Sequence, residues 1–366
     1  MMKIFAYLGK HTLGDFLTDA LYVCAVRELF DTAELTVSYV DNRPHKADIV
    51  SCIWNAKTVI KKTFGEALLP VLAFESQARN LLELDPELRA SGGLDADLIL
   101  TGAMCQEPYL NGLPLPALRY PEDKMEMCDQ ALIDLGLEPD RWIATVYWKE
   151  PGYRYRGSMP VREIPDATPY MAAIRHVIEN LGGQVVRIGH RTDLVLPEIP
   201  GLVDLAKVDN SHWLQMYAVS VSRFMLASAS GPSAYGPAFG VPTVLTDHVE
   251  VTGVWRSHDY ILTRGMIRDG REYRQKDAYD AGMLEGYPHW EKLERPMGYR
   301  WNTSEELVGA ADEMFHSTRS CLGWRAPMAG DVTLPRPNVF KIPQPQRRPV
   351  ELLIPPRQRA TLAAGP

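Results

Sequence analysis

Apolar runs alternate with amphipathic segments along this chain, a pattern typical of a parallel α/β protein. Short apolar runs predict buried strands at 3–8, 35–40, 68–74, 97–100, 143–148, 184–188, 202–204, 223–227 and 240–245. Between them, apolar side chains at helical spacing predict helices at 15–30, 167–181, 210–222, 234–239 and 304–317. Strands and helices that alternate in this way favour parallel sheets covered by helices on both faces.

The pattern runs through two cycles, and the second begins near Trp142. A chain of 366 residues is long for one core, so we expect more than one domain. The sequence predicts an N-terminal Rossmann-like domain over 1–140 and a C-terminal one over 141–326. The segment 327–366 holds nine prolines in 40 residues and has no periodicity, which predicts an extended tail.

Composition and charge exclude several classes of protein. With 46% hydrophobic and 23% charged residues the chain is globular, and its net charge of −7 argues against a partner made of nucleic acid. No apolar stretch approaches the roughly 20 residues of a membrane span, and residues 1–9 form a first strand rather than a signal peptide. Five scattered cysteines favour a reducing cytoplasm, and no metal-ligand motif is present, so we expect no bound metal.

The segment SASGPSAYGPAFGVPT, residues 228–243, follows one predicted strand and ends in the next. A strand, a turn of small residues and a short helix together present main-chain N–H groups and the positive end of a helix dipole. That arrangement favours a phosphate, held by Ser230, Gly231 and Ser233. The alternative is an ordinary strand-to-helix turn.

Cationic side chains follow two of the predicted strands. Arg187 and His190 lie at and just past the end of one strand, and Lys149 holds the matching position on another. Ligands of open α/β sheets collect outside the strand ends, where such cations can neutralise a leaving diphosphate. Asp247 follows a later strand, where it can meet the hydroxyls of a donor sugar. Surface ion pairs and a satisfied loop are the alternatives.

Two motifs resemble the heptosyltransferase-like glycosyltransferases of the GT-B class. KHTLGDFLTDAL, residues 10–21, resembles the loop and first helix of that family, where a Gly-Asp pair opens the helix. The segment at 228–243 resembles its donor-phosphate loop. The stretches 142–150, 182–189 and 201–206 also resemble a family of glycosyltransferases, so the likeness covers about 140–316 well and the N-terminal half weakly.

The resemblance implies two Rossmann-like domains that face each other across a cleft. The C-terminal domain would bind a nucleoside diphosphate sugar as donor substrate, and the N-terminal domain a small-molecule or glycan acceptor, with no other cofactor. The expected reaction is an inverting, metal-independent transfer. Asp15 matches the family's general base, His11 is a second candidate for that role, and Gly14 allows close approach of the backbone to ligand. Asp15 as a plain helix cap is the alternative.

One departure from related families matters. Fucosyltransferase-like relatives carry His-x-Arg where this chain has Tyr147-Trp148-Lys149-Glu150, and lysine lacks the bidentate geometry of arginine. A sugar-nucleotide epimerase of the same fold and a non-catalytic sugar-nucleotide-binding protein are therefore alternatives. A nicotinamide-dependent oxidoreductase has little support, because KHTLGD replaces the Gly-x-Gly-x-x-Gly fingerprint after the first strand.

Overall fold

The computed structural model of the chain describes residues 2–9, 12–28, 30, 33–41, 43–62, 96, 98–101, 116–151, 162–190, 194–248, 256, 258–273, 298–318 and 324. Contacts divide the chain into two compact units, with the division between Pro121 and Glu122. The division therefore precedes the expected domain boundary at 140/141, and the acceptor and donor roles of the two halves stay predictions. The strand expected at 68–74 and the tail at 327–366 fall wholly outside the described residues.

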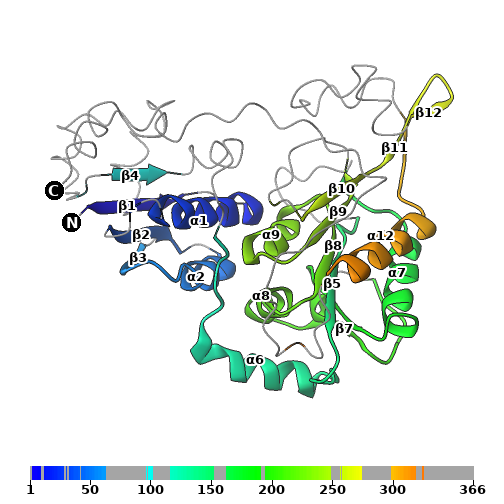
Figure 1. Cartoon of the computed structure of the whole chain (residues 1–366), viewed down its shortest axis with the longest axis horizontal. Helices are drawn as coiled ribbons and strands as arrows, with labels where there is room; N and C mark the ends of the chain where they lie inside the picture. The colour runs from blue at the N-terminus through cyan, green and yellow to red at the C-terminus, as the bar shows by residue number, and fades with distance from the viewer. Residues whose placement is uncertain are drawn as a thin grey trace. The chain divides into compact units, whose positions relative to one another are not determined.

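The first unit is a four-stranded parallel sheet (Figure 1). Its elements are β1 (Lys3–Leu8), α1 (Leu13–Glu28), β2 (Glu34–Val40), α2 (Pro44–Ser51), β3 (Thr58–Lys62) and β4 (Leu98–Thr101). The strand order is β3-β2-β1-β4, and every neighbouring pair is parallel. Helix α1 buries Phe16, Leu17 and Ala20, as its apolar spacing predicted.

The second unit is built on a six-stranded parallel sheet. Its elements up to the third strand are α6 (Glu122–Asp134), β5 (Ile143–Tyr147), α7 (Thr168–Glu179), β6 (Gln184–Arg187), β7 (Leu202–Asp204) and the 3₁₀ turn η3 (Leu205–Lys207). Next come α8 (His212–Ser220), β8 (Phe224–Ser228), the 3₁₀ turn η4 (Gly231–Ala234), α9 (Tyr235–Phe239), β9 (Thr243–His248) and β10 (Tyr260–Thr263). The unit's last described helix is α12 (Ser304–Ser317).

The strand order of this sheet is β10-β9-β8-β5-β6-β7. All five neighbouring pairs are parallel, and the order is that of the doubly wound Rossmann sheet. The chain runs outward from β5 through β6 to β7, then returns to the other side of β5 with β8. In such sheets ligands bind at the strand ends where the winding reverses, which here means between β5 and β8.

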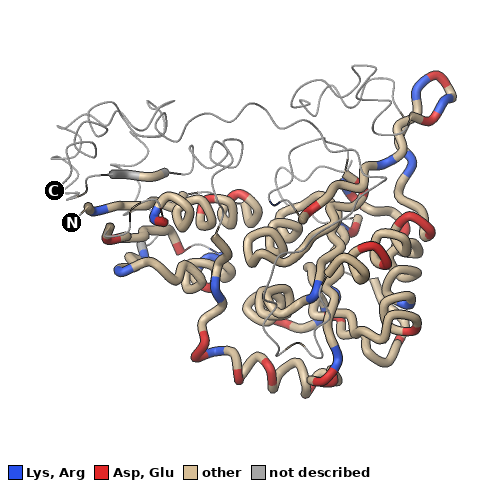
Figure 2. The backbone as a smooth tube through the Cα atoms, viewed as in Figure 1, with Lys and Arg blue, Asp and Glu red and all other residues tan. Residues whose placement is uncertain are grey.

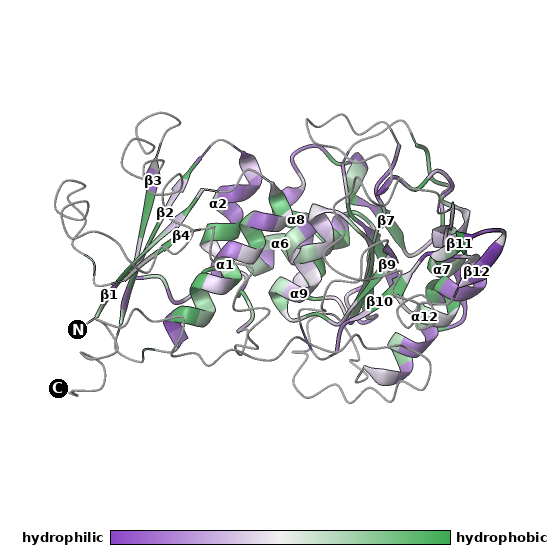
Figure 3. Ribbon diagram, turned by 90° about the horizontal axis from the view of Figure 1, so that it is seen from above, coloured by the Kyte–Doolittle hydropathy of each residue, from purple (hydrophilic) through white to green (hydrophobic). Residues whose placement is uncertain are grey.

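Helices cover both faces of the six-stranded sheet. Helices α7 and α12 lie on one face and α8 and α9 on the other (Figures 1 and 3). The core on the α7 side joins strand residues such as Val146 and Leu226 to Ile174 of α7 and Met314 of α12. Most residues of these strands are accordingly apolar, and green is prominent in this sheet in Figure 3. No described helix is long and apolar enough to cross a membrane.

A small antiparallel sheet continues from the edge strand β10. It consists of β11 (Gly265–Arg268), β12 (Arg271–Tyr273) and β13 (Gly298–Arg300), in the order β12-β11-β13. The β11–β12 hairpin carries charges of both signs, as Figure 2 shows. Sequence analysis predicted none of these three strands, because each is only three or four residues long and half polar.

Gly236 of α9 and Gly309 of α12 make a matched pair for a packing test. A Cβ atom on Gly236 would stand 2.1 Å from the Thr243 hydroxyl oxygen and 3.1 Å from the Met225 sulfur. One on Gly309 would have no heavy atom within 4 Å apart from its chain neighbours and the backbone of its own helix. Gly236→Ala should lower the free energy of unfolding by about 1–3 kcal/mol through overpacking. Gly309→Ala should raise it by roughly 0.5–1 kcal/mol, because alanine favours a helix interior. Urea denaturation checks both signs, and equal effects would contradict the packing of α9 on β8 and β9.

Candidate functional site

The carboxyl ends of β5 and β8 are joined where the winding of the sheet reverses. The main-chain N–H of Lys149 donates a hydrogen bond of 2.9 Å to the Ser228 hydroxyl oxygen. The carbonyl of Lys149 accepts from the N–H of Ile164 at 2.7 Å, so the backbone of this residue is held on both sides. The Lys149 side chain is buried, and burial lowers the pKa of its ammonium group. Lys149 thus lies just past the end of β5, as the sequence predicted, on the side of the sheet where ligands bind in this fold.

The loop after β8 has the strand–turn–helix form that the sequence predicted. Ser230 is extended, η4 and α9 follow without a break, and Gly240 ends α9 with φ of 74° in the left-handed region. Ser233 uses both its N–H and its hydroxyl to bond the Ser230 carbonyl, at 3.1 and 2.6 Å. Pro232 has no N–H to offer. The main-chain donors that the loop can present to an anion are therefore those of Ser230 and Gly231, and Ser233 fixes the shape of the turn.

Arg187 lies at the end of β6, as predicted, but its guanidinium group is bonded inside the protein. It pairs with Asp204 at 2.8 Å and with Glu150, and its central carbon lies 4.4 Å from the centre of the Trp148 ring. The side chain is buried, and burial lowers its pKa. This arrangement ties the ends of β5, β6 and β7 together and fixes the segment that carries Lys149 and Glu150.

His190 follows a turn at Gly189, whose φ is 148°. The Gln215 side chain fixes that turn, because it accepts from the Gly189 N–H and donates to its carbonyl, both at 3.0 Å. His190 itself is exposed. Partial desolvation, together with neighbouring His212, lowers the pKa of its ring. At neutral pH the imidazole of His190 is therefore a neutral hydrogen-bonding group rather than a cation.

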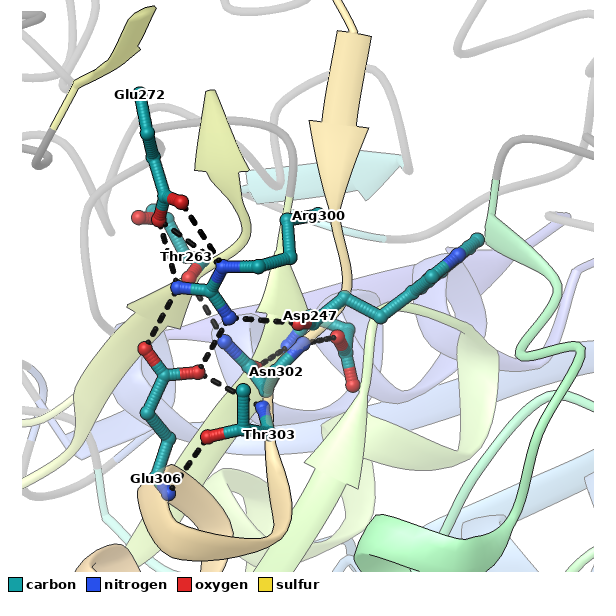
Figure 4. Close-up of polar contacts among 8 residues, drawn as sticks. Asp247, Thr263, Glu272, Arg300, Asn302, Thr303 and Glu306 are labelled. Carbon is teal, nitrogen blue, oxygen red and sulfur yellow. Dashed lines mark hydrogen bonds and ion pairs between the residues drawn. The ribbon is translucent and has the colours of Figure 1, made fainter. Parts of the chain in front are cut away.

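Asp247, near the end of β9, is buried in a network of hydrogen bonds (Figure 4). Its carboxylate accepts from the Asn302 N–H at 2.6 Å and from the Tyr170 hydroxyl at 2.7 Å. Its own N–H donates to the Asn302 side-chain oxygen at 2.6 Å. The backbone of Asp247 is left-handed, with φ of 51°, which aspartate tolerates better than most residues. Both carboxylate oxygens are thus used by the protein, which favours an anchoring role over contact with a sugar.

The segment that carries Asn302 is itself clamped. Arg300 bonds Glu272 of the hairpin and Glu306 of α12, and the capping box of Thr303 and Glu306 begins that helix, as the sequence predicted (Figure 4). Asn302 also donates to the Thr263 carbonyl at 2.9 Å. The ends of β9 and β10 and the start of α12 are therefore joined through one asparagine.

In the first unit, Asp15 is an exposed residue in the first turn of α1. Its carboxylate accepts from the Thr12 hydroxyl at 2.5 Å, a local contact typical of a helix start. Gly14 lies beside it in the same turn, and its carbonyl accepts from the Thr18 hydroxyl at 2.9 Å. His11 lies outside the described residues. The geometry leaves Asp15 accessible and fits both the base and the cap interpretations.

Sequence analysis missed four side chains that organise this edge of the sheet: Glu150, Tyr170, Asp204 and Asn302. Each is a partner of a residue that was predicted. A signal existed only for Glu150, which directly follows Lys149. The others come from elements far away in sequence, so only the fold brings them together. Among the described residues, no cluster of three or more His, Cys, Asp or Glu side chains could hold a metal ion.

The comparisons with known proteins bear on the fold. No protein-family model matches the chain, and no curated protein matches it. The structure is similar to the glycosyl transferase family 9 protein of Veillonella parvula, with 14% identity, a TM-score of 0.53 and coverage of 87% of this chain and 98% of that one. It is also similar to the ADP-heptose LPS heptosyltransferase II of E. coli, with 15% identity, a TM-score of 0.51 and coverage of 86% and 99%.

At these identities the likeness shows the fold. The predicted α/β class with two Rossmann-like halves, the GT-B fold of these glycosyltransferases, is confirmed. The placement of the halves across a cleft stays a prediction, and so do the roles of the individual site residues.

The buried carboxyl group of Asp247 generates a prediction about pH. Burial raises its pKa above the ordinary value of 3.8, even though its hydrogen bonds with Asn302 and Tyr170 favour the charged form. Between 3.8 and the raised pKa the folded protein binds more protons than the unfolded chain. The contribution of this group to stability is therefore present below 3.8 and is lost as pH rises through the folded pKa.

Asp247→Asn removes this titration. The free energy of unfolding of this variant, minus that of the wild type, should increase as pH rises from about 4 to about 7, because only the wild type loses stability through this group. Urea unfolding at several pH values measures the difference. Asp134→Asn, at an exposed carboxyl of α6, controls for net charge. A difference that stays level with pH would contradict the raised pKa of Asp247.

Proposed function

We propose that this protein is a glycosyltransferase that moves a sugar from a nucleoside diphosphate donor to a small-molecule or glycan acceptor. The observation that supports it most is the arrangement at the ends of β5 and β8. There a buried lysine and two main-chain N–H donors lie at the strand ends where ligands of this fold bind. The GT-B fold agrees with this reaction, but it hosts other chemistry as well, so the proposal depends on the site.

In this proposal the second unit binds the donor. Lys149 and the N–H groups of Ser230 and Gly231 face the diphosphate, on which negative charge grows as the bond to the sugar breaks. Groups fixed before the reaction stabilise that charge without reorganisation, which is the main source of rate in many transferases. These protein groups take the role that a divalent metal has in other transferases, so we propose a metal-independent reaction.

The remaining predicted donor residues take supporting roles. Arg187 positions the β5 end through Glu150 and Asp204, and Ser233 shapes the loop. Asp247 anchors the β9 end, and the neutral ring of His190 offers a hydrogen bond beside β6.

The first unit, in this proposal, binds the acceptor and supplies Asp15 as the general base. The carboxylate of Asp15 takes the proton from the acceptor hydroxyl as its oxygen attacks the anomeric carbon. The bond from that carbon to the diphosphate breaks on the opposite face, so the configuration inverts. The exposure of Asp15 in the first turn of α1 supports contact with a substrate. His11 is the second candidate for the base. The buried thiols of Cys24, Cys52 and Cys128 agree with a reducing cytoplasm as the place of action.

Binding of a nucleoside diphosphate tests the donor site. In a thermal-shift screen with ADP, GDP, UDP and dTDP, one nucleotide should stabilise the full chain by about 2.7 kcal/mol at a hundredfold excess over its Kd. Lys149→Met should weaken that nucleotide's binding by about tenfold or more, because a charge-assisted contact is lost.

Arg175→Met is the matched control. It removes one exposed cation of α7, which pairs with Glu179, and should leave nucleotide binding unchanged. Failure of all four nucleotides to bind would refute the proposed function. An epimer formed from the sugar nucleotide without acceptor would identify an epimerase instead. Binding of the donor with neither transfer nor slow hydrolysis would identify a non-catalytic binder.

Replacement of Asp15 tests the base. Asp15→Asn should lower the transfer rate by roughly 10²–10⁴-fold, the usual contribution of a general base, while donor affinity stays the same. Thr12→Val separates this role from helix capping. It removes the hydroxyl that Asp15 bonds but keeps the carboxylate, so it should lower thermal stability and keep most of the rate. Equal loss of rate in the two variants would assign Asp15 to capping.

A further inference from the structure

Arg264 differs from the other buried arginines that the structure describes. Arg187 has two carboxylate partners, so that only its Nε atom lacks an acceptor among the described residues. Arg223 donates to the Thr318 hydroxyl and carbonyl and to the Phe315 carbonyl. Arg264 is 3% exposed, yet its Nε and Nη2 atoms have no acceptor among the described residues. Two guanidinium nitrogens have therefore left water without gaining a hydrogen bond in the part of the protein that the structure describes.

The position of Arg264 is well defined in spite of this. It directly follows β10, and its N–H donates to the His248 carbonyl at 3.1 Å, at the carboxyl end of β9. Its guanidinium carbon lies 3.1 Å from the centre of the Trp301 ring, so one face of the group is covered by the indole. Trp301 comes between two residues whose side chains are held in place. Arg300 bonds Glu272 and Glu306, and Asn302 bonds the ends of β9 and β10. The cation thus lies on a fixed platform.

The carboxylate that most attracts Arg264 accepts no hydrogen bond from its Nε or Nη2 atoms. Asp247 attracts Arg264, but its two oxygens are occupied by the Asn302 N–H and the Tyr170 hydroxyl. Burial lowers the pKa of Arg264 to about 10, which still leaves the side chain protonated at neutral pH. A buried cation with unmade hydrogen bonds destabilises a fold. Such a local cost is expected chiefly at functional sites.

A stacked arginine keeps its hydrogen-bond donors available in the plane of the group. With the ring of Trp301 over one face, the N–H groups of Arg264 lie along the edges of the guanidinium plane. That planar fork matches the two oxygens of a carboxylate or the oxygens of a phosphate. The ligand class that would satisfy Nε and Nη2 together is therefore an oxyanion.

The oxyanion is a different group from the leaving diphosphate. β10 is two strands away from β8 in the sheet, and a strand spacing of about 4.8 Å puts their ends roughly 10 Å apart. A diphosphate held at the Ser230 loop does not span that distance. A sugar linked to the diphosphate adds enough length to cover that distance, so a carboxylate or phosphate on the sugar would reach the end of β10.

We propose that Arg264, stacked on Trp301, binds a second oxyanion at the carboxyl edge of the sheet. Its assignment to an acidic substituent of the donor sugar rests on the proposed function. The oxyanion site itself does not, because it follows from the unmade hydrogen bonds of Arg264.

The test compares two methionine variants of buried arginines, using the full chain. Arg264→Met should keep or raise the melting temperature in the absence of anions, because it removes a buried charge with unmade hydrogen bonds. Arg223→Met, the matched control, should lower it, because that arginine bonds Thr318 and Phe315. A melting temperature lowered equally by both variants would show that Arg264 is structural and would overturn the proposal.

Anion binding is then measured by thermal shift with inorganic phosphate and with acetate, against chloride at equal ionic strength. At least one of the two should stabilise the wild type more than chloride, and Arg264→Met should weaken its apparent affinity by about tenfold. Arg264→Lys keeps the positive charge but loses the planar pair of donors. Its affinity for the anion should therefore lie between that of the wild type and that of Arg264→Met. A response to phosphate alone or to acetate alone identifies the class of substituent.

A phosphate and acetate response that equals that of chloride, or that survives in Arg264→Met, would overturn the proposal. Failure of the proposed function is distinguishable, because it appears as absent nucleotide binding. Lys149→Met should reduce nucleotide binding and leave the response of Arg264 to the small anion in place. Arg264→Met should leave the affinity for the nucleoside diphosphate itself unchanged.

Discussion

A parallel sheet that is buried on both faces can carry charged side chains only at the ends of its strands, and that constraint organises the second unit. Strands such as β5 and β8 are fully buried along their length, so charged side chains occur only where the strands end. The carboxyl edge therefore collects Asp204, Arg187, Glu150, Lys149, Ser228, Asp247 and Arg264 across six strands. Because all six strands run the same way, residues from distant parts of the chain come to one edge.

Two kinds of group share this edge. Some side chains are paired within the protein, as Arg187 is with Asp204 and Asp247 is with Asn302 and Tyr170. They fix the strand ends relative to one another. Others lie at the same edge with donors that the described protein does not use, as the Nε and Nη2 atoms of Arg264 show. The first kind gives the second a fixed geometry, which binding and catalysis both require.

The sequence predicted those features that depend on local patterns. The bounds of β1, β7 and α12 agree with the predicted 3–8, 202–204 and 304–317, since apolar spacing and a capping box lie within the segments themselves. Local patterns also predicted the loop at Ser230 and the strand-end position of Arg187. They offered an ion pair of Arg187 only as an alternative and did not identify its partners, because Glu150 and Asp204 reach it only when β5, β6 and β7 align. The same reason kept Arg264 and the Asn302 contacts out of the prediction.

The contacts of Arg223 carry a consequence for how the second unit forms during synthesis. This arginine directly precedes β8, at the centre of the sheet, yet its guanidinium donors bond Phe315 and Thr318 at the end of α12. Those acceptors do not yet exist when the ribosome has made only the strands, because Phe315 and Thr318 follow later in the chain. The contacts of the central strands are therefore complete only when a segment more than 90 residues later has emerged and docked, a long-range step of the kind that slows folding.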